Sequence, residues 1–278
     1  MTQEIASSGA LPDSLVLAGA GKMGGAMLQG WLDAGLRDGA ALVLDPAPSG
    51  EIEALARAGR IRLEPTADAT APDILVLGIK PQMLDEAAPQ LRAHAGDRTL
   101  VVSILAGKTI DDLARALPQA RAFIRAMPNL PASVGRGATG AYANPAVDTA
   151  QRATAARLLA CNGIVEWVER EELIDAVTAL SGSGPAYAFH LVEAMAAAGA
   201  AAGLPADLAG RLARATVAGA GALLDRSELP ASTLRENVTS KGGTTAAALE
   251  VLMAADGLTP LVTRAVAAAK RRAGELAG

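Results

Sequence analysis

The stretch from residue 14 to residue 34 restricts the fold of this chain more than any other part of the sequence. An apolar run at 14–18 has the character of a buried strand, the next six residues read Gly-Ala-Gly-Lys-Met-Gly, and residues 25–34 favour a helix. Strand, GxGxxG and helix in this order form the fingerprint of a dinucleotide-binding βαβ unit, because the glycines allow a tight turn, a close approach of the pyrophosphate and close helix packing. The cofactor-binding residues predicted from this pattern are Gly19, Ala20, Gly21, Lys22, Met23 and Gly24.

The end of the next strand bears on the choice of cofactor. An apolar run at 41–44 ends at Asp45, about 20 residues beyond the fingerprint, where an acidic side chain can bind the ribose 2′-OH and repels a 2′-phosphate. Residues 46–50 supply no Arg or Lys, so these residues favour NADH, although Arg57 or Arg60 could reach the site. The cofactor is therefore expected to be NADPH or NADH, with the choice left open.

The alternation of strands and helices continues through the first half of the chain. We expect strands at 60–63, 73–78, 100–103, 121–126 and 164–168, with helices at 51–58 and 148–160. This alternation predicts an α/β fold with a doubly wound, Rossmann-type sheet. Ligands lie along the carboxyl edge of such a sheet, so Lys80 is either a cofactor contact or an exposed loop lysine. His94 lies in a polar stretch and is expected at the surface.

The second half of the chain has no strand pattern, and we place the domain boundary between residues 170 and 171. Helices are expected at 185–202, 205–226 and 260–276. The first of these is apolar nearly all round, and a helix of that kind is buried on all sides. A domain of 171–278 can rarely surround such a helix by itself, so we expect a second copy of the chain to cover it. His190 on this helix is interpreted as a hydrogen-bonded structural residue rather than an acid–base group.

Residues 240–245, Ser-Lys-Gly-Gly-Thr-Thr, form a turn between two helical segments. Gly242 and Gly243 allow a sharp bend, and Thr244 and Thr245 begin an Ala-rich helix. A helix start carries unpaired N–H groups and partial positive charge, which suits a small carboxylate. The alternative is a plain helix–helix turn with Thr as the N-cap, and these residues alone do not exclude it.

Bulk properties exclude several classes of function. A net charge of −4 without a basic stripe argues against nucleic acid, and no apolar run reaches the ~18 residues of a membrane span. The single cysteine, Cys161, permits no internal disulfide, which favours the cytoplasm. Residues 1–14 lack a basic residue before an apolar run, so we expect no signal peptide. No cluster has metal-ligand spacing, and no metal is expected.

Taken together, the motifs resemble those of the pyrroline-5-carboxylate reductase family, which catalyses the last step of proline synthesis. The matching stretches are 19–24, 79–81, 101–103 with 106–107, 125–129, 175–178 with 181–187, and 234–249. They spread over nearly the whole chain. The last two blocks are specific to this family, whereas the first is shared by many nucleotide enzymes.

The resemblance implies an NAD(P)H-dependent reductase that delivers hydride to C5 of the cyclic imine 1-pyrroline-5-carboxylate and gives L-proline. The substrate carboxylate would bind N–H groups of the 240–245 turn, and the Thr245 hydroxyl would face the ring nitrogen as the catalytic group. The implied substrate-binding residues are Glu171, Ser240, Gly243, Thr244 and Thr245. The implied cofactor-lining residues are Gly78, Ile79, Lys80, Pro81, Leu105, Ala106, Gly107 and Asn237. The family also implies a homodimer through the helical domain, often assembled as a ring of five dimers.

Two departures from the family pattern and two alternatives remain. Lys241 stands where relatives commonly have Pro, and Asp45 lies where NADPH users prefer neutral or basic residues. A β-hydroxyacid dehydrogenase also joins a dinucleotide domain to a helical one, but residues 185–193 lack the lysine that this chemistry needs after the glycine-rich loop. A non-enzymatic dinucleotide sensor would leave the 240–245 turn unexplained.

Overall fold

The computed structural model describes residues 10–63 and 71–277. These residues form two compact units. The first contains the described residues up to 182 together with those from 269 to 277, and the second contains residues 183–268. The predicted boundary at residue 170 stays a prediction. The expectation about a signal peptide concerns residues 1–14, of which 1–9 lie outside the described residues.

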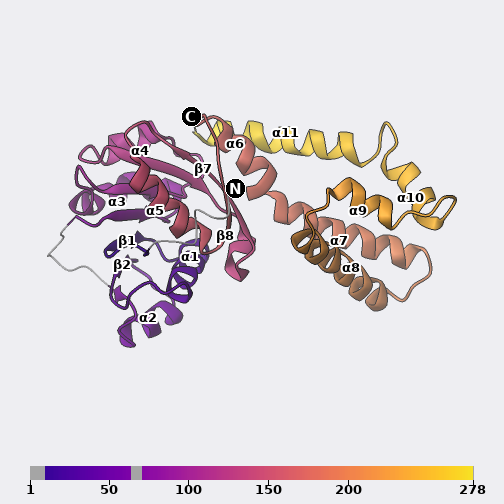
Figure 1. Ribbon diagram of the computed structural model, residues 1–278, viewed down its shortest axis with the longest axis horizontal. Helices are drawn as coiled ribbons and strands as arrows, with labels where there is room; N and C mark the ends of the chain where they lie inside the picture. Colours follow the sequence, from indigo (N-terminus) through magenta and orange to yellow (C-terminus); the bar gives the residue numbers. More distant parts are fainter. Residues whose placement is uncertain (1–9, 64–70, 278) are drawn as a thin grey trace. The chain divides into compact units, whose positions relative to one another are not determined.

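The first unit is built on an eight-stranded sheet with the order β3-β2-β1-β4-β5-β6-β7-β8 (Figure 1). Its strands are β1 (Leu15–Ala18), β2 (Ala41–Leu44), β3 (Arg62–Leu63), β4 (Ile74–Leu77), β5 (Leu100–Ser103), β6 (Ala122–Met127), β7 (Gly137–Ala143) and β8 (Gly163–Trp167). Neighbouring strands run parallel from β3 to β6, β7 is antiparallel to β6, and β8 is parallel to β7. This topology confirms the doubly wound α/β fold.

Two hydrophobic cores lie on the two faces of this sheet, because successive residues of a strand point to opposite faces. Leu15 and Leu17 of β1 belong to one core, and Val16 and Ala18 belong to the other. The first core also contains residues of α1 (Lys22–Asp33), α2 (Gly50–Arg57) and α5 (Thr149–Ala160). The second contains residues of α3 (Leu84–Leu91) and α4 (Ile110–Ala116). Strands buried on both faces explain why β1, β2 and β4 are apolar throughout and why β5 is apolar up to Ser103.

Three local expectations differ from the structure. The predicted strand at 60–63 is reduced to the two residues of β3, and α1 begins at Lys22, three residues before the predicted start. The strand β7 follows the short helix η4 (Leu130–Val134) and was not predicted, because the run Gly-Ala-Thr-Gly-Ala-Tyr-Ala contains few of the large apolar residues that mark a strand.

The prediction that His94 is a surface residue was wrong. The chain continues from α3 into the short helix η3 (Arg92–His94), which leaves the His94 side chain only 5% exposed. The polar residues near His94 in the sequence suggested an exposed side chain. The course of the chain through η3 buries this side chain instead. Two further short helices, η2 (Pro81–Met83) and η5 (Thr178–Gly182), belong to the same unit, as does α6 (Leu173–Val177).

The second unit is helical, as predicted. Its elements are α7 (Gly184–Ala201), α8 (Ala206–Arg226), α9 (Ala231–Asn237), α10 (Thr244–Leu252) and the first part of α11 (Leu258–Ala277). Within residues 183–268 the only buried side chains are Ala209 and Ala213. In the described part of the chain, no helix combines the length and the apolar character that crossing a bilayer requires.

Candidate active site

The predicted cofactor residues meet where the order of the strands reverses. β1 lies between β2 and β4, and the chain leaves β1 at Gly19 and β4 at Gly78. Gly78 N donates to Ala18 O at 2.7 Å, and a Cβ atom added to Gly19 would lie 2.7 Å from Ile79 N. The loops 19–24 and 78–81 are therefore side by side at the carboxyl edge, the place where α/β sheets bind nucleotides.

The glycine-rich loop leads directly into α1. A Cβ atom on Gly24 would collide with Gly19 O, so only glycine lets the first turn of α1 pack against the loop. The N-cap of α1 is Gly21, which has no side chain to cap the first N–H groups, and the space around a Cβ at Gly21 is open. Free N–H groups with positive dipole and open space fit the pyrophosphate of a dinucleotide.

Asp45 holds the glycine-rich loop through its carboxylate. Oδ2 accepts a hydrogen bond from Ala20 N at 2.8 Å, and Oδ1 accepts one from Ala47 N at 2.9 Å. The carboxylate is therefore fixed beside the loop, at the end of β2, where the sequence predicts a ribose contact. Of the two lysines predicted near the cofactor, Lys22 is the first residue of α1 and Lys80 precedes η2, and both are exposed.

The third predicted cofactor segment, 105–107, follows β5. Ser103 Oγ accepts a hydrogen bond from Leu105 N at 3.2 Å, which fixes the start of this loop. At the other end, Thr109 and Asp112 form a reciprocal capping box at the start of α4. Burial raises the pKa of Asp112, but hydrogen bonds from Thr109 and the charges of Arg115 and Lys108 outweigh burial and leave this pKa below its usual value.

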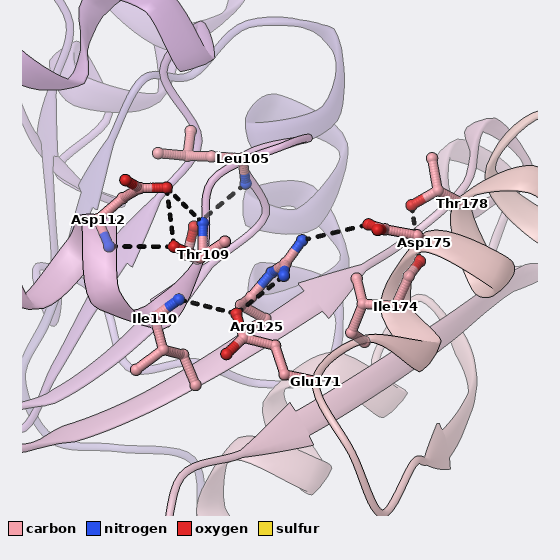
Figure 2. A network of polar contacts seen from close by, with 10 residues as sticks. Leu105, Thr109, Ile110, Asp112, Arg125, Glu171, Ile174, Asp175 and Thr178 are labelled. Atoms are coloured by element: carbon pink, nitrogen blue, oxygen red, sulfur yellow. Dashed lines mark hydrogen bonds and ion pairs between the residues drawn. The ribbon is translucent and has the colours of Figure 1, made fainter. Parts of the chain in front are cut away.

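Glu171 lies next to this loop, in a network with a buried arginine (Figure 2). Glu171 Oε1 accepts hydrogen bonds from Ile110 N and from Arg125 Nη1, both at 2.8 Å. Arg125 lies in β6 and is 4% exposed, and its Nη2 is 3.9 Å from Asp175 Oδ1. Arg125 was not predicted as a site residue, although a charged residue inside an apolar strand is a sequence signal for one.

The 240–245 turn has the local structure that the sequence predicted. Gly242 has a φ of +72°, and Gly243 N donates to Ser240 O at 3.0 Å. A Cβ atom on Gly243 would overlap Ser240 Oγ, so a larger residue at this position requires the Ser240 hydroxyl to move. Gly243 is the N-cap of α10, which begins at Thr244. The turn thus presents N–H groups at a helix start, and its role as a carboxylate seat stays a prediction.

The predicted site residues fall into two sets. The cofactor loops, Asp45 and Glu171 belong to the first unit, whereas Asn237, at the end of α9, and the 240–245 turn belong to the second. His190 Nδ1 lies 3.0 Å from Glu193 Oε2 on an exposed part of α7. Among the described residues, no group of three or more His, Cys, Asp or Glu side chains could hold a metal ion.

Comparison with known proteins decides the family. Residues 171–276 match the family described as pyrroline-5-carboxylate reductase dimerisation, and residues 14–107 match NADP oxidoreductase, coenzyme F420-dependent. A pyrroline-5-carboxylate reductase of Pseudomonas aeruginosa is 38% identical over 264 residues, covering 95% of this chain and 96% of that protein. The chain belongs to the pyrroline-5-carboxylate reductase family.

Solved structures of the reductase family have the same architecture. A pyrroline-5-carboxylate reductase from Coxiella burnetii, 32% identical, superposes with a TM-score of 0.89 over 97% of this chain and 100% of that one. The Plasmodium falciparum pyrroline carboxylate reductase with NADP bound is 25% identical and has a TM-score of 0.78 over 97% of this chain and 100% of that one. The helical half of the present chain is thus the dimerisation domain of a reductase, and its first half is an NAD(P)H-binding domain.

Proposed function

We propose that this chain reduces the C=N bond of 1-pyrroline-5-carboxylate with NADPH or NADH and releases L-proline. The observation that carries the proposal is the likeness to a pyrroline-5-carboxylate reductase over 95% of the chain, which includes both the dinucleotide loops and the 240–245 turn. The structure of that turn supports the proposal, because Gly243 caps α10 without a side chain and leaves the N–H groups of the helix start open to a ligand.

The 240–245 turn is the proposed seat of the substrate carboxylate. Ser240 and the N–H groups of Gly243, Thr244 and Thr245 can donate hydrogen bonds to a carboxylate, and the dipole of α10 favours negative charge at this end. Gly243 N also donates to Ser240 O within the turn, so Thr244 N and Thr245 N, at the helix start, are the main donors. Lys241 adds a positive charge beside them.

The chemistry itself depends mainly on positioning. The reduced nicotinamide supplies the hydride when it is bound. An imine protonated on nitrogen is already electrophilic, and holding it in a reactive orientation can be worth ~7 kcal/mol or more. The Thr245 hydroxyl is the proposed hydrogen-bond partner of the ring nitrogen, directly or through water. Its oxygen accepts a hydrogen bond from the N–H of the protonated imine, so the nitrogen keeps its proton while hydride adds to C5 and the C=N bond becomes a C–N bond. Asn237 is the proposed contact on the nicotinamide side.

The residues of the first unit bind the dinucleotide. N–H groups at the start of α1 would hold the pyrophosphate, and Asp45, which fixes the loop through Ala20 N, would accept a hydrogen bond from the ribose hydroxyl. A carboxylate at this position repels a 2′-phosphate, so we expect NADH to be the better substrate of the two cofactors.

The proposed assembly is a homodimer through the helical domain, with five dimers in a ring, located in the cytoplasm. Large apolar side chains are exposed on α7 of the single chain, among them Phe189 at 57% and Leu191 at 43%. A second copy of the chain that covered these side chains would remove them from water, at about 25 cal/mol per Å² of apolar surface.

A spectrophotometric assay tests the activity. Purified protein is mixed with pyrroline-5-carboxylate and either NADH or NADPH, and the loss of reduced-nicotinamide absorbance is followed together with proline formation. We expect oxidation that requires the pyrroline and yields proline in equal amount. Dinucleotide binding without this oxidation would instead indicate a sensor, and oxidation of β-hydroxyacids would indicate a dehydrogenase. A crystal soaked with proline should hold the amino acid beside residues 240–245, and another location would contradict the proposed seat.

A further inference from the structure

Arg125 is a buried cation at the carboxyl edge of the sheet. It pairs in register with Ser103 of β5 and has an exposed fraction of only 4%. Removing a guanidinium from water carries a large penalty, and well-packed apolar residues are often as stabilising as a buried ion pair. A charge at this position therefore points to a role in arrangement rather than in stability alone.

The partner of Arg125 connects it to the start of α4. One oxygen of Glu171 accepts hydrogen bonds from both Arg125 Nη1 and Ile110 N (Figure 2). Glu171 follows Ile110 by 61 positions and Arg125 by 46, so the network joins three separate segments of the first unit. Within the described residues, Arg125 Nη2 has no hydrogen-bond partner, and Asp175 is its second acidic neighbour at 3.9 Å.

Both ends of the loop at 104–109 are held by this arrangement. At the start, Ser103 is paired with Arg125 across the sheet and accepts the hydrogen bond from Leu105 N. At the end, Ile110 N is bound by Glu171, next to the Thr109 capping box. The loop between these points carries the residues Leu105, Ala106 and Gly107, which are expected to line the nicotinamide half of the cofactor.

The last turns of α11 contact the same region from another side. A Cβ atom on Gly107, whose φ is +73°, would lie 2.7 Å from Leu276 O, and one on Gly274 would lie 3.9 Å from Asp175 Oδ2. The loop is thus packed against backbone at its tip and bound through Ile110 at its end. These contacts leave the loop 104–109 little conformational freedom.

We infer that Arg125 and Glu171 are positioning residues for the loop 104–109, and that their ion pair sets the place of the nicotinamide half of NAD(P)H without contacting the substrate. The inference rests on the proposed function only in naming the dinucleotide. It gives Glu171 a role different from the substrate contact that the family resemblance implies.

Dinucleotide binding without pyrroline separates these roles. Dissociation constants for NADH, NADPH and ADP-ribose are measured for wild type, Glu171→Ala, Glu171→Gln and Arg125→Met. ADP-ribose lacks the nicotinamide and depends on the glycine-rich loop and Asp45. We expect Glu171→Ala to raise the dissociation constants of NADH and NADPH by about tenfold and that of ADP-ribose by less than about twofold. Glu171→Gln keeps an oxygen for Ile110 N and should fall between wild type and Glu171→Ala.

Two controls make the result specific. Leu158→Ala opens a cavity at a fully buried side chain, in the core that contains residues of α1, α2 and α5. It should lower thermal stability without changing the ratio of the dissociation constants of NADH and ADP-ribose. The double variant Arg125→Met with Glu171→Ala should bind NADH with a dissociation constant within about twofold of that of Glu171→Ala. The effects of two residues in one network are not additive. If Arg125→Met does not fold, the two Glu171 variants decide.

The inference is overturned if Glu171→Ala and Glu171→Gln bind NADH and NADPH within about twofold of wild type, or if ADP-ribose weakens as much as NADH. Unchanged dinucleotide binding with a raised KM for pyrroline would return Glu171 to a substrate contact. If wild type binds NADH but does not reduce pyrroline, the proposed function fails, whereas the binding comparison still tests the loop.

Discussion

Thr245 is the residue on which the proposed chemistry depends most directly. It is the second residue of α10, and its hydroxyl is the proposed hydrogen-bond partner of the ring nitrogen. Replacing Thr245 with Ala should lower kcat/KM for pyrroline by about tenfold or more, equivalent to ~1.4 kcal/mol of transition-state stabilisation. Steady-state kinetics with saturating cofactor measures this loss.

Two variants serve as controls for Thr245→Ala. Thr245→Ser keeps the hydroxyl and should retain most of the activity. Thr216→Ala removes a hydroxyl that donates only to Leu212 O within α8, and its kcat/KM should equal that of wild type. A kcat/KM for Thr245→Ala within about threefold of wild type would show that the hydroxyl has no catalytic role.

We expect His94 to make the stability of the first unit depend on pH. Burial lowers the pKa of His94, and within the described residues its Nδ1 has no hydrogen-bond partner. In the unfolded chain the imidazole takes up a proton near pH ~6.5, whereas in the folded chain it stays neutral to lower pH. The contribution of His94 to stability is therefore complete above that pH and decreases as the pH falls below it.

Urea unfolding at several pH values tests this dependence. Between pH ~7.5 and pH ~5.5, the unfolding free energy of wild type should fall by more than that of His94→Leu, since Leu has no proton to gain. Asp148→Asn, which alters an exposed helix cap, is a control for general effects of substitution. Equal slopes for wild type and His94→Leu would contradict the prediction.

At the scale of elements, the α9–α10 turn is the part on which the proposed carboxylate seat depends. Gly243→Ala would force its new methyl group against Ser240 Oγ and displace the Ser240 hydroxyl, one of the proposed carboxylate donors. We expect KM for pyrroline to rise by about tenfold while KM for the cofactor changes by less than about twofold. Kinetics with each substrate varied in turn separates the two constants.

The contact with Ser240 can itself be tested. In a Ser240→Ala background the colliding oxygen is absent. Gly243→Ala should therefore raise KM for pyrroline by a smaller factor there than in wild type. Gly50→Ala is a control, since a Cβ at this first residue of α2 meets open space. An equal effect of Gly243→Ala in both backgrounds would show that the turn tolerates the methyl group.

At the scale of the whole molecule, the helical unit lacks a core of its own. Residues 183–268 bury only two side chains, both alanine, although ordering each residue costs roughly 1–2 kcal/mol of backbone entropy. The exposed apolar side chains of α7, α8 and α11 must therefore gain their burial by association. For that reason the free energy of unfolding of this protein is expected to depend on its association with a second copy.

Phe189→Glu tests this coupling. A carboxylate at a position that another copy covers must be desolvated, so the dimer should weaken by about a hundredfold, or ~2.7 kcal/mol. Light scattering coupled to size-exclusion chromatography at falling protein concentration measures the mass. Phe189→Leu should assemble like wild type. An unchanged mass for Phe189→Glu at micromolar concentration would place α7 outside the interface.

Most of the fold could be predicted because its signals are local. The GxGxxG loop, the apolar strands β1, β2, β4 and β5, and the Gly-Gly turn before α10 each depend on residues close in sequence. β7 was missed because its small residues form a strand by pairing with β6 and β8, which lie elsewhere in the sequence. Burial of His94 and the acidic partners of Arg125 could not be predicted, since both depend on segments that lie elsewhere in the chain.

The sequence by itself determined the α/β class, the dinucleotide loops, the helical second half and the turn at 240–245, because glycine spacing and runs of apolar residues constrain the nearby backbone. The tertiary structure alone decided that Glu171 binds Arg125 and Ile110, and that Gly107 packs against the end of α11. These contacts join residues 46 or more positions apart, and folding selects them through the burial of charge and the packing of backbone on backbone.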